Sequence, residues 1–400
     1  MTLRWHIVTG EYPPLPGGVS DYTFILAGLL ADAGDEVHVW TSKAPQRKLN
    51  SKIILHELPG HFGLRALWRL HRALNRDAQP FRLLVQYVPQ MYGFKGMNLP
   101  FAFWLSRQRH LKPWIMFHEV AMRPAAHLSL KHRLLAHAQQ AMARWIVRSM
   151  SRGFVSTQAW QGYLQDIAPE NSACEWLPVP SNVATNADRE IVAQLRQLFA
   201  PGSATRLVAH FGTYGGTTAD DVARIFVRLL QQFPDFNVLL LGKGSNDFAA
   251  KLRGLHPALG GRIHSAGYLP SDQLAAHLLA ADVLFQPYAD GVSTRRGSAM
   301  AGLALGLPIV TSAGAATEAL WSDEKLVVVV DPLDELRILH ALDIWSQPST
   351  ERNAQMARAK NGYERFFGWH NTIAHLQECA APSRCSQPGI QASSGPITCL

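Results

Sequence analysis

Residues Phe285–Thr311 read FQPYADGVSTRRGSAMAGLALGLPIVT, and their pattern indicates the class of fold. A strand is predicted to end at Gln286, a polar loop follows, and a helix of small residues is predicted to begin near Gly297. The β-branched run Ile309–Ser312 then predicts a second strand. Two strands that are joined through a helix lie parallel in one sheet, so this stretch indicates an α/β protein.

The same alternation of short apolar runs and helical segments extends along the rest of the chain. Predicted strands cover residues 4–8, 36–41, 53–57, 82–86, 113–118 and 153–156, and then 206–211, 237–242, 262–266, 283–287, 309–312 and 325–329. The apolar spacing of residues 20–33 predicts the first helix. The pattern restarts after about residue 180, so we expect two doubly wound, Rossmann-like domains, residues 1–180 and 181–365. A cleft between the carboxyl ends of their strands is the expected ligand site.

Composition narrows the class of protein. The chain has 400 residues, of which 47% are hydrophobic and 17% charged, as is typical of a folded protein with two domains. No run of about 20 apolar residues is present, and the first residues are too polar for a secretory signal, so we expect a cytoplasmic protein. Residues 380–400 carry no periodic pattern and predict a disordered tail. The cysteines, Cys174, Cys379, Cys385 and Cys399, form no C-x-x-C pair, which favours neither a disulfide framework nor a thiolate metal site.

Basic residues are concentrated in the first half of the chain. Residues 1–180 hold 20 Lys and Arg against 11 Asp and Glu, whereas residues 181–400 hold 18 against 19. Two predicted amphipathic helices contribute cationic stripes: Arg65, Arg69, Arg72 and Arg76 opposite Leu67, Leu70 and Leu74, and Arg133, His137, Arg144 and Arg148 opposite Leu134, Ala138, Met142 and Trp145. Each stripe alone is equally typical of a solvated helix face. Together they favour an anionic partner, such as a membrane surface or a phosphate-bearing acceptor, and we expect no nucleic-acid partner.

Two segments have the residues that an anionic ligand needs. Gly17 and Gly18 lie between the first strand and the first helix, where a backbone without side chains can approach a phosphate at the start of a helix. Ordinary turn chemistry is the alternative, and neither G-x-G-x-x-G nor a P-loop is present. Arg295 and Arg296 follow Asp290 in the loop before the helix at Gly297. Two guanidinium groups at the start of a helix suit a pyrophosphate.

Over about 375 residues the sequence resembles the family 4 glycosyltransferases of GT-B fold. The resemblance depends on E-Y-P-P-x-x-G-G-V-x-x-Y at Glu11–Tyr22, Phe117-His118-Glu119, the LLLGKG segment at Leu239–Gly244, the AGYLP turn at Ala266–Pro270, and Asp290–Pro308, all in family order. It implies a retaining enzyme whose second domain binds a UDP- or GDP-linked sugar and whose first domain binds the acceptor. It also implies no metal or other cofactor, and no D-x-D motif follows a strand. A helix at residues 366–379 is expected to cross back to the first domain.

The resemblance also assigns roles to individual residues. Gly17 and Gly18 match the glycine loop beside the donor phosphates, and His118 matches a histidine near the transferred sugar, although a lone histidine at a strand end is more often structural. Donor contacts are further expected from Gly267, Tyr268, Leu269, Ser298 and Glu318, and Asp290 is expected to contact the sugar. Ser298 stands where the family has the second glutamate of its E-x7-E motif. The loop at Phe211–Thr218 lacks the family's Arg and Lys, and we expect Arg295 and Arg296 to replace them.

We therefore expect a glycosyltransferase that moves a sugar from a nucleotide-sugar donor to a glycan or lipid-linked acceptor. Front-face attack would retain the anomeric configuration, with the departing phosphate accepting the proton of the acceptor. Cell-surface polysaccharide or glycolipid synthesis is the expected process, with peripheral binding to the inner face of the plasma membrane through the two stripes. Two alternatives remain: an epimerase or phosphorylase of the same fold, and an inactive nucleotide-sugar-binding protein, which Ser298 and the missing Arg and Lys make conceivable.

Overall fold

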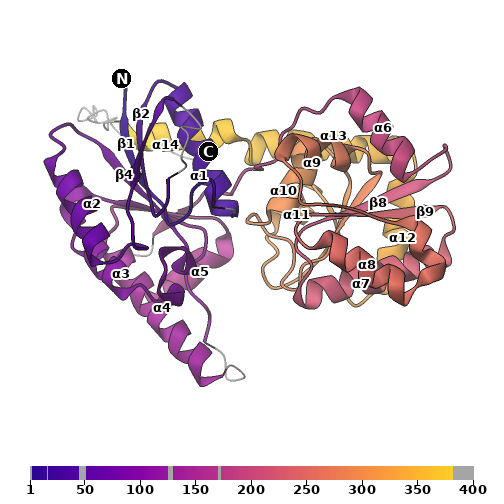
Figure 1. Ribbon diagram of the computed structural model, residues 1–400, viewed down its shortest axis with the longest axis horizontal. Helices are drawn as coiled ribbons and strands as arrows, with labels where there is room; N and C mark the ends of the chain where they lie inside the picture. Colours follow the sequence, from indigo (N-terminus) through magenta and orange to yellow (C-terminus); the bar gives the residue numbers. More distant parts are fainter. Residues whose placement is uncertain (1, 16, 45–50, 125–128, 170–172, 382–400) are drawn as a thin grey trace, which may run out of the picture.

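The computed structural model describes residues 2–15, 17–44, 51–124, 129–169 and 173–381. Two α/β domains stand side by side and are joined by the linker near residue 180 and by the last helix, which returns to the first domain (Figure 1). Within the described residues each domain contains one parallel sheet with helices on both faces. The predicted α/β fold class is confirmed.

The amino-terminal domain contains a seven-stranded sheet in the order β3-β2-β1-β4-β5-β6-β7. Its elements are β1 Arg4–Val8, α1 Gly18–Asp32, β2 Glu36–Thr41, β3 Ile53–Glu57, α2 Leu64–Arg76, β4 Arg82–Tyr87, the 3-10 turns η1 Pro89–Tyr92 and η2 Phe94–Gly96, α3 Leu99–Ser106, η3 Arg109–Leu111, β5 Trp114–Phe117, α4 Leu130–Ser149, β6 Arg152–Val155, α5 Gln158–Ile167 and β7 Cys174–Trp176. All of these strand pairs are parallel, so the carboxyl ends of the strands lie along one edge of the sheet.

The carboxyl-terminal domain contains a six-stranded sheet in the order β10-β9-β8-β11-β12-β13. Its elements are α6 Arg189–Phe199, β8 Arg206–Phe211, α7 Gly216–Gln232, β9 Phe236–Leu241, α8 Ser245–Leu255, η5 Pro257–Arg262, β10 Ile263–Gly267, α9 Ser271–Leu279, β11 Val283–Gln286, α10 Gly297–Leu305, β12 Ile309–Ser312, α11 Leu320–Asp323, β13 Val328–Val330, α12 Glu335–Ser346 and α13 Thr350–Phe366. The order of both sheets reverses at its first strand, which is where open α/β sheets bind ligands.

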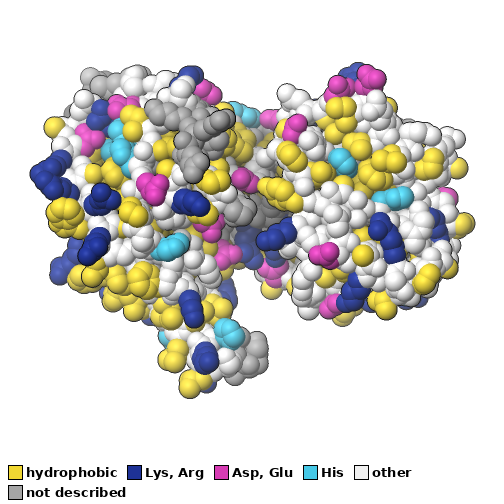
Figure 2. All heavy atoms as spheres, viewed as in Figure 1, with side chains coloured by type: hydrophobic (Ala, Val, Ile, Leu, Met, Phe, Trp, Pro, Cys, Tyr) yellow, Lys and Arg dark blue, Asp and Glu magenta, His cyan; other side chains and the backbone are white. Residues whose placement is uncertain are grey.

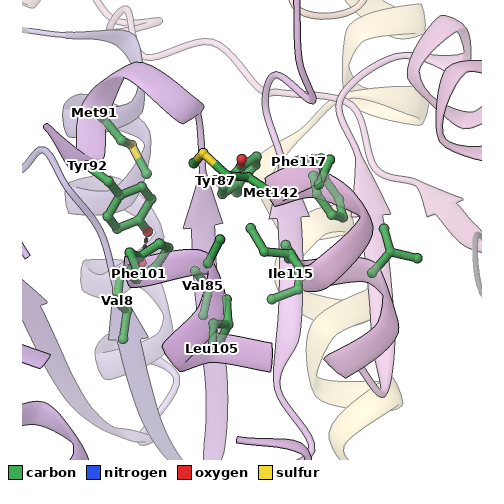
Figure 3. Close-up of a cluster of buried hydrophobic side chains, with 14 of the residues drawn as sticks. Val8, Val85, Tyr87, Met91, Tyr92, Phe101, Leu105, Ile115, Phe117 and Met142 are labelled. Carbon is green, nitrogen blue, oxygen red and sulfur yellow. Dashed lines mark hydrogen bonds between the residues drawn. The ribbon is translucent and has the colours of Figure 1, made fainter. Parts of the chain in front are cut away.

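Apolar strands and amphipathic helices explain why these elements form. The strands read as continuous apolar runs because helices cover both faces, and β9 is buried over its whole length. On one face of the first sheet, Val85 and Ile115 pack against Phe101 and Leu105 of α3 (Figure 3). Each such buried side chain contributes roughly 1.5–3 kcal/mol. The two cores hold the strand ends, and therefore the loops between the domains, in place.

The last helix, α14 Trp369–Ala380, packs against α1 of the first domain. Leu376 is buried in the first domain's core, and the Arg82 side chain donates a hydrogen bond to the carbonyl of Ala380 at 2.8 Å. The chain therefore crosses between the domains a second time. The expected tail falls largely on residues 382–400, together with Cys385 and Cys399, and these lie outside the described residues.

The structure corrects the expected local structure at four places. Strand β7 was not expected, and the expected strand at 325–329 is β13, Val328–Val330, because Lys325 adopts φ +50° in the turn before it. In α4 the expected apolar residue Leu134 is 61% exposed, because the start of this helix projects beyond the body of the domain (Figure 1). Arg144 is also not on a free outer face, since its Nε donates to the carbonyl of Ile167 at 2.9 Å.

Candidate active site

A cleft of about 650 Å³ lies between the carboxyl ends of the two sheets. Figure 2 shows a groove between the two domains at this place. Residues of both domains line it: Glu11, Gly17, Gly18, Val19, Asp21, Tyr22, Val88, His118, Glu119 and Ser156 from the first, Val179, Pro180 and Asn182 from the linker, and His210–Thr213, Gly215, Thr218, Gly242, Lys243, Tyr268, Gln286, Tyr288 and Arg295–Ser298 from the second. The position expected for the ligand site is therefore a real cavity.

The carboxyl-terminal wall of the cleft is positively charged. Its charged lining residues are Lys243, Arg295 and Arg296. The Asp290 carboxylate, which is not itself part of the lining, bonds to both guanidinium groups, to Arg295 Nη2 at 3.2 Å and to Arg296 Nη2 in a short contact. The Arg296 guanidinium also lies 4.7 Å from the centroid of the Tyr288 ring. Three cations and one carboxylate leave this wall with a net charge of about +2.

The amino-terminal wall has the opposite character. Glu11, Asp21 and Glu119 line it, and none of the lining residues from the first domain is Lys or Arg. Burial raises the pKa of Glu11 and of Asp21, although the hydrogen bond that Asn182 donates to Asp21 at 2.9 Å acts in the opposite direction. Glu119 reaches across the cleft to Arg295 Nη1 at 3.3 Å. The two walls are therefore electrostatically complementary.

Three helices begin at the cleft without a side-chain cap. They are α1 at Gly18, α7 at Gly216 and α10 at Gly297, and the residues before them accept no capping hydrogen bond through a side chain. Free N–H groups and the positive end of the helix dipole favour an anion at such positions. A Cβ at Gly17 would lie 2.4 Å from Glu11 Oε2, so a larger residue there would displace the Glu11 carboxylate. At Gly18 a Cβ would meet nothing within 4 Å, so its backbone faces open space.

His118 follows β5 and presents its ring to the cleft. The ring Nε2 lies 2.7 Å from Gln86 Oε1 on the neighbouring strand β4, and Tyr22 packs edge-on against the ring. Burial lowers the pKa of His118 to about 3 and that of His210, on the opposite wall, also to about 3. Both imidazoles are therefore neutral at physiological pH, so neither adds positive charge to a phosphate site.

Thr294 connects the domains beside the cleft. Its Oγ1 lies 2.8 Å from both the carbonyl oxygen of Ser156 and Glu318 Oε1, so the hydroxyl hydrogen is shared between these two acceptors. Trp176 Nε1 donates to Thr294 Oγ1 at 3.2 Å. The buried carboxylate of Glu318 accepts hydrogen bonds from the Thr294 N–H and from Trp321 Nε1. The loop that presents Arg295 and Arg296 is thereby fixed to both domains.

The sequence-predicted residues separate into two groups. Gly17, Gly18, His118, Tyr268, Arg295, Arg296 and Ser298 line the cleft. Asp290 lies behind the arginines, Leu269 packs against the second domain's core, and Glu318 is 5% exposed with its carboxylate bonded to the Thr294 loop. Gly267 forms a turn at φ +71° whose carbonyl accepts from the Gly242 N–H. Leu269, Glu318 and Gly267 therefore do not line the cleft, because each of them contacts other parts of the second domain instead.

Sequence reasoning missed several lining residues. Glu11, Asp21 and Glu119 were passed over, although all three lie inside the quoted motifs. Lys243 was quoted within LLLGKG but given no role, although a lysine after a strand end is the signal of a phosphate site. Tyr288 was also missed, and its hydroxyl lies 2.7 Å from Ser298 Oγ while burial raises its pKa to about 12.

Among the described residues, one group of side chains has the composition of a metal site, and it lies away from the cleft. Glu175 of β7 and His375 and Cys379 of α14 bring their ligand atoms within 4.8 Å of one another. The Arg152 guanidinium, however, lies 2.8 Å from Cys379 Sγ and also bonds to Glu175. The arginine thus already supplies the positive charge at this position.

A second surface feature is a basic face on the amino-terminal domain. It comprises Arg65, Arg69, Arg72 and Arg76 of α2, Arg107 directly after α3, and Lys131 and Arg133 of α4, with the exposed apolar side chains Leu64, Trp68, Phe103, Leu130 and Leu134 among them. Helix α3 packs between α2 and α4, and Figure 2 shows hydrophobic and basic side chains together along this side. No described helix has the length and hydropathy needed to cross a membrane. The α2 stripe is confirmed as exposed, with Leu67, Leu70 and Leu74 buried opposite it.

Comparisons with known proteins find the same fold in solved structures and a family model that matches part of the carboxyl-terminal domain. Residues 205–344 match the family model of glycosyl transferases group 1. WaaG, a glycosyltransferase involved in lipopolysaccharide biosynthesis, superposes with a TM-score of 0.67 at 16% identity, over 94% of this chain and 99% of WaaG. Sucrose-phosphate synthase from Thermosynechococcus elongatus gives 0.67 at 16% identity, over 94% and 98%. Anabaena HepE in complex with UDP-glucose gives 0.65 at 15% identity, over 94% and 99%. No curated protein matches the sequence.

Proposed function

We propose that this chain, which has the GT-B fold and the carboxyl-terminal domain of a group 1 glycosyltransferase, transfers a sugar from a nucleotide-sugar donor to an acceptor hydroxyl in the cleft. The observation that carries the proposal is the division of charge between the walls. The carboxyl-terminal wall has a net charge of about +2 and two uncapped helix starts, whereas the amino-terminal wall has three carboxylates. A diphosphate fits the first wall, and the hydroxyls of a sugar acceptor fit the second.

The donor's diphosphate would lie against Arg295, Arg296 and Lys243. These cations stand where they can neutralise the charge that develops on the leaving phosphate in a site with little water. They would bind the diphosphate in place of the Arg and Lys that the glycosyltransferase family has in the loop at 211–218 and that this chain lacks there. HepE has been crystallised with UDP-glucose and with UDP, which agrees with a nucleotide-sugar site in this fold.

The reaction would proceed by front-face attack with retention, in which no covalent intermediate forms on the protein. Asp290, the carboxylate nearest the two arginines, bonds to both, so it is held away from a nucleophile's role. His118 and His210 are neutral, and neither is a source of a proton for the leaving group. In this scheme the C–O bond to the departing phosphate breaks, the acceptor oxygen bonds to the same carbon, and the phosphate accepts the acceptor's proton.

The acceptor would be a glycan or a lipid-linked sugar brought in at a membrane. The basic face combines at least four arginines that have no ion-pair partner among the described residues with exposed Trp68 and Leu64, which are 59% and 76% exposed. Arginines attract anionic headgroups, and the apolar side chains can enter the interface. WaaG acts in lipopolysaccharide biosynthesis, and we propose a comparable role in cell-surface polysaccharide or glycolipid synthesis. The protein would then be cytoplasmic and peripherally bound.

A thermal-shift screen with UDP, GDP, UDP-glucose and GDP-mannose tests the donor site. A ligand at about 100 times its Kd should stabilise the native state by about 2.7 kcal/mol. Products formed from the best donor then separate the alternatives. An epimerase consumes donor without acceptor, a phosphorylase requires free phosphate, and an inactive protein binds without turnover. The proposal fails if none of the four ligands raises the melting temperature.

Cosedimentation with vesicles of anionic and neutral lipid tests the membrane surface. Arg69→Glu with Arg72→Glu should reduce binding to anionic vesicles at least tenfold, since each basic residue near the surface contributes about 1 kcal/mol. The matched control is Lys251→Glu with Arg337→Glu, which changes the same charge at exposed positions of the second domain. Equal binding by the two double variants would contradict the assignment and leave a solvated helix face.

A further inference from the structure

Neighbouring groups fix the orientation of His118. The backbone N–H of His118 donates to the carbonyl of Tyr87 at 3.0 Å. The backbone carbonyl of His118 accepts from Ser156 Oγ at 3.0 Å and from Trp160 Nε1 at 3.1 Å. The Tyr22 ring packs edge-on against the imidazole, with centroids 4.8 Å apart and planes at 77°. The ring therefore has little freedom to rotate, and Nε2 is directed at Gln86.

Gln86 is an unusual residue for the interior of a parallel strand. It is fully buried near the end of β4, next to β5 in the sheet. Its Oε1 lies 2.7 Å from His118 Nε2, whereas its Nε2 is buried and has no hydrogen-bond partner among the described residues. A buried amide nitrogen without a partner destabilises a fold, so this glutamine is a poor choice for stability alone.

The contact with Gln86 selects the protonation state of the ring. With the Gln86 Oε1 atom facing the ring, the amide accepts, so His118 Nε2 carries the hydrogen and, in the neutral ring, Nδ1 is unprotonated. The Nδ1 atom has no partner among the described residues, and the ring lines the cleft. We propose that Gln86 is a positioning residue that holds His118 as the Nε2–H tautomer and so presents Nδ1 to the cleft as an uncharged hydrogen-bond acceptor for a sugar hydroxyl.

The unshared electron pair on His118 Nδ1 determines which ligand groups this part of the cleft can bind. A neutral acceptor binds the hydroxyl of a sugar but repels a carboxylate or phosphate oxygen, which places the diphosphate on the opposite wall with the cations. The sugar as ligand rests on the proposed function. The tautomer itself does not, because it is a property of the protein without substrate.

The tautomer can be measured directly in the full chain. Histidine labelled with ¹⁵N gives long-range proton–nitrogen spectra that distinguish a protonated ring nitrogen from an unprotonated one. The signals of His118 among the 17 histidines are assigned by their loss in His118→Asn. We expect a protonated Nε2 and an unprotonated Nδ1 in the wild type, and a mixture of both tautomers in Gln86→Met.

Stability and turnover separate a positioning role from a structural one. Gln86→Met removes the amide while nearly conserving volume, so we expect an unchanged or higher melting temperature, an unchanged Kd for UDP and a roughly tenfold lower kcat/KM. Gln139→Met is the matched control, because Gln139 is equally buried but both ends of its amide are bonded, to the Met122 N–H and the Gly96 carbonyl. It should lower the melting temperature and leave the His118 spectrum and kcat/KM as in the wild type.

The proposal is overturned by a protonated Nδ1 in the wild type, by a Gln86→Met protein with the wild-type His118 spectrum, or by a changed tautomer without loss of kcat/KM. These results are distinguishable from a failure of the proposed function. If no nucleotide or nucleotide sugar binds while the spectra behave as expected, the sugar transferase is refuted and the control of the tautomer by Gln86 stands.

Discussion

Replacing Arg296 by alanine is the strictest test of the cation wall, which is the carboxyl-terminal wall of the cleft with Lys243, Arg295 and Arg296. Its guanidinium bonds to Asp290, lies against the Tyr288 ring and is about a quarter exposed in the cleft. At about 4 Å from a phosphate oxygen, one unit charge contributes about 4 kcal/mol at an effective dielectric constant of about 20. Arg295 and Lys243 remain in the variant and compensate in part, so we expect a loss of about 3–4 kcal/mol in the transition state. The expected fall in kcat is therefore roughly 100- to 1000-fold.

The same substitution should change folding stability little. The ion pair with Asp290 is partly exposed, and such pairs contribute about 1 kcal/mol or less. Arg296 Nε is buried without a partner among the described residues, so its removal offsets part of that loss. Urea denaturation of Arg296→Ala should therefore differ from the wild type by less than about 1 kcal/mol.

The control for Arg296→Ala is Arg224→Ala on the outer surface. Arg224 also bonds to carboxylates, those of Asp221 and Glu335, but it lies outside the cleft. We expect wild-type kcat in this variant. Steady-state rates with the donor identified by thermal shift would refute the reasoning if Arg296→Ala kept more than about a third of the wild-type kcat, or if Arg224→Ala lost as much as Arg296→Ala.

Three further expectations follow from the structure. Thr294→Val removes the hydroxyl bonded to Ser156, and this hydrogen bond contributes about 1 kcal/mol to the contact between the domains. The radius of gyration in solution should therefore increase. An unchanged radius would count against this contact. Glu318→Ala leaves the buried donors around it without an acceptor and should lower the free energy of unfolding by about 2–4 kcal/mol in urea, whereas a loss under about 1 kcal/mol would contradict that role. Because the pKa values of His118 and His210 lie near 3 in the folded state, below the ordinary value of about 6.5, the unfolded state binds more protons and stability should fall as pH decreases from about 6.5, by roughly 1.4 kcal/mol per unit for each histidine. Urea titrations at pH 7 and pH 5 measure this, and His210→Asn should show a smaller difference than the wild type.

The fold could be predicted because buried parallel strands appear in the sequence as separate apolar runs. Eleven of the twelve predicted strands lie within one residue of the observed bounds at either end. Strand β7, Cys174–Trp176, was missed because three residues make no recognisable run and their pairing with β6 is a tertiary effect. The error in α4 has a similar cause. A helical wheel gives the face that is apolar, but Leu134 is exposed because no element of the described chain covers the first turns of that helix.

The site was predictable where a residue's chemistry and its place at a strand end agreed. His118, Arg295 and Arg296 meet both conditions, and all three line the cleft. For Glu318 the family position suggested a ligand, but the direction of the side chain depends on donors 24 residues earlier in the chain, at Thr294. Acidic Glu11 was passed over because a carboxylate next to a phosphate loop has no evident role until the two walls are seen together.

The loop between β11 and α10 connects donor binding to the arrangement of the domains. Thr294 bonds to the first domain through Ser156, and the next two residues are the arginines of the cation wall. Arg295 extends the same connection, because its guanidinium contacts Asp290 behind it and Glu119 across the cleft. A diphosphate that binds this guanidinium must compete with both carboxylates. Donor binding should therefore weaken the Glu119 contact, and release of the nucleotide should restore it, so that the two domains respond to the donor through one arginine.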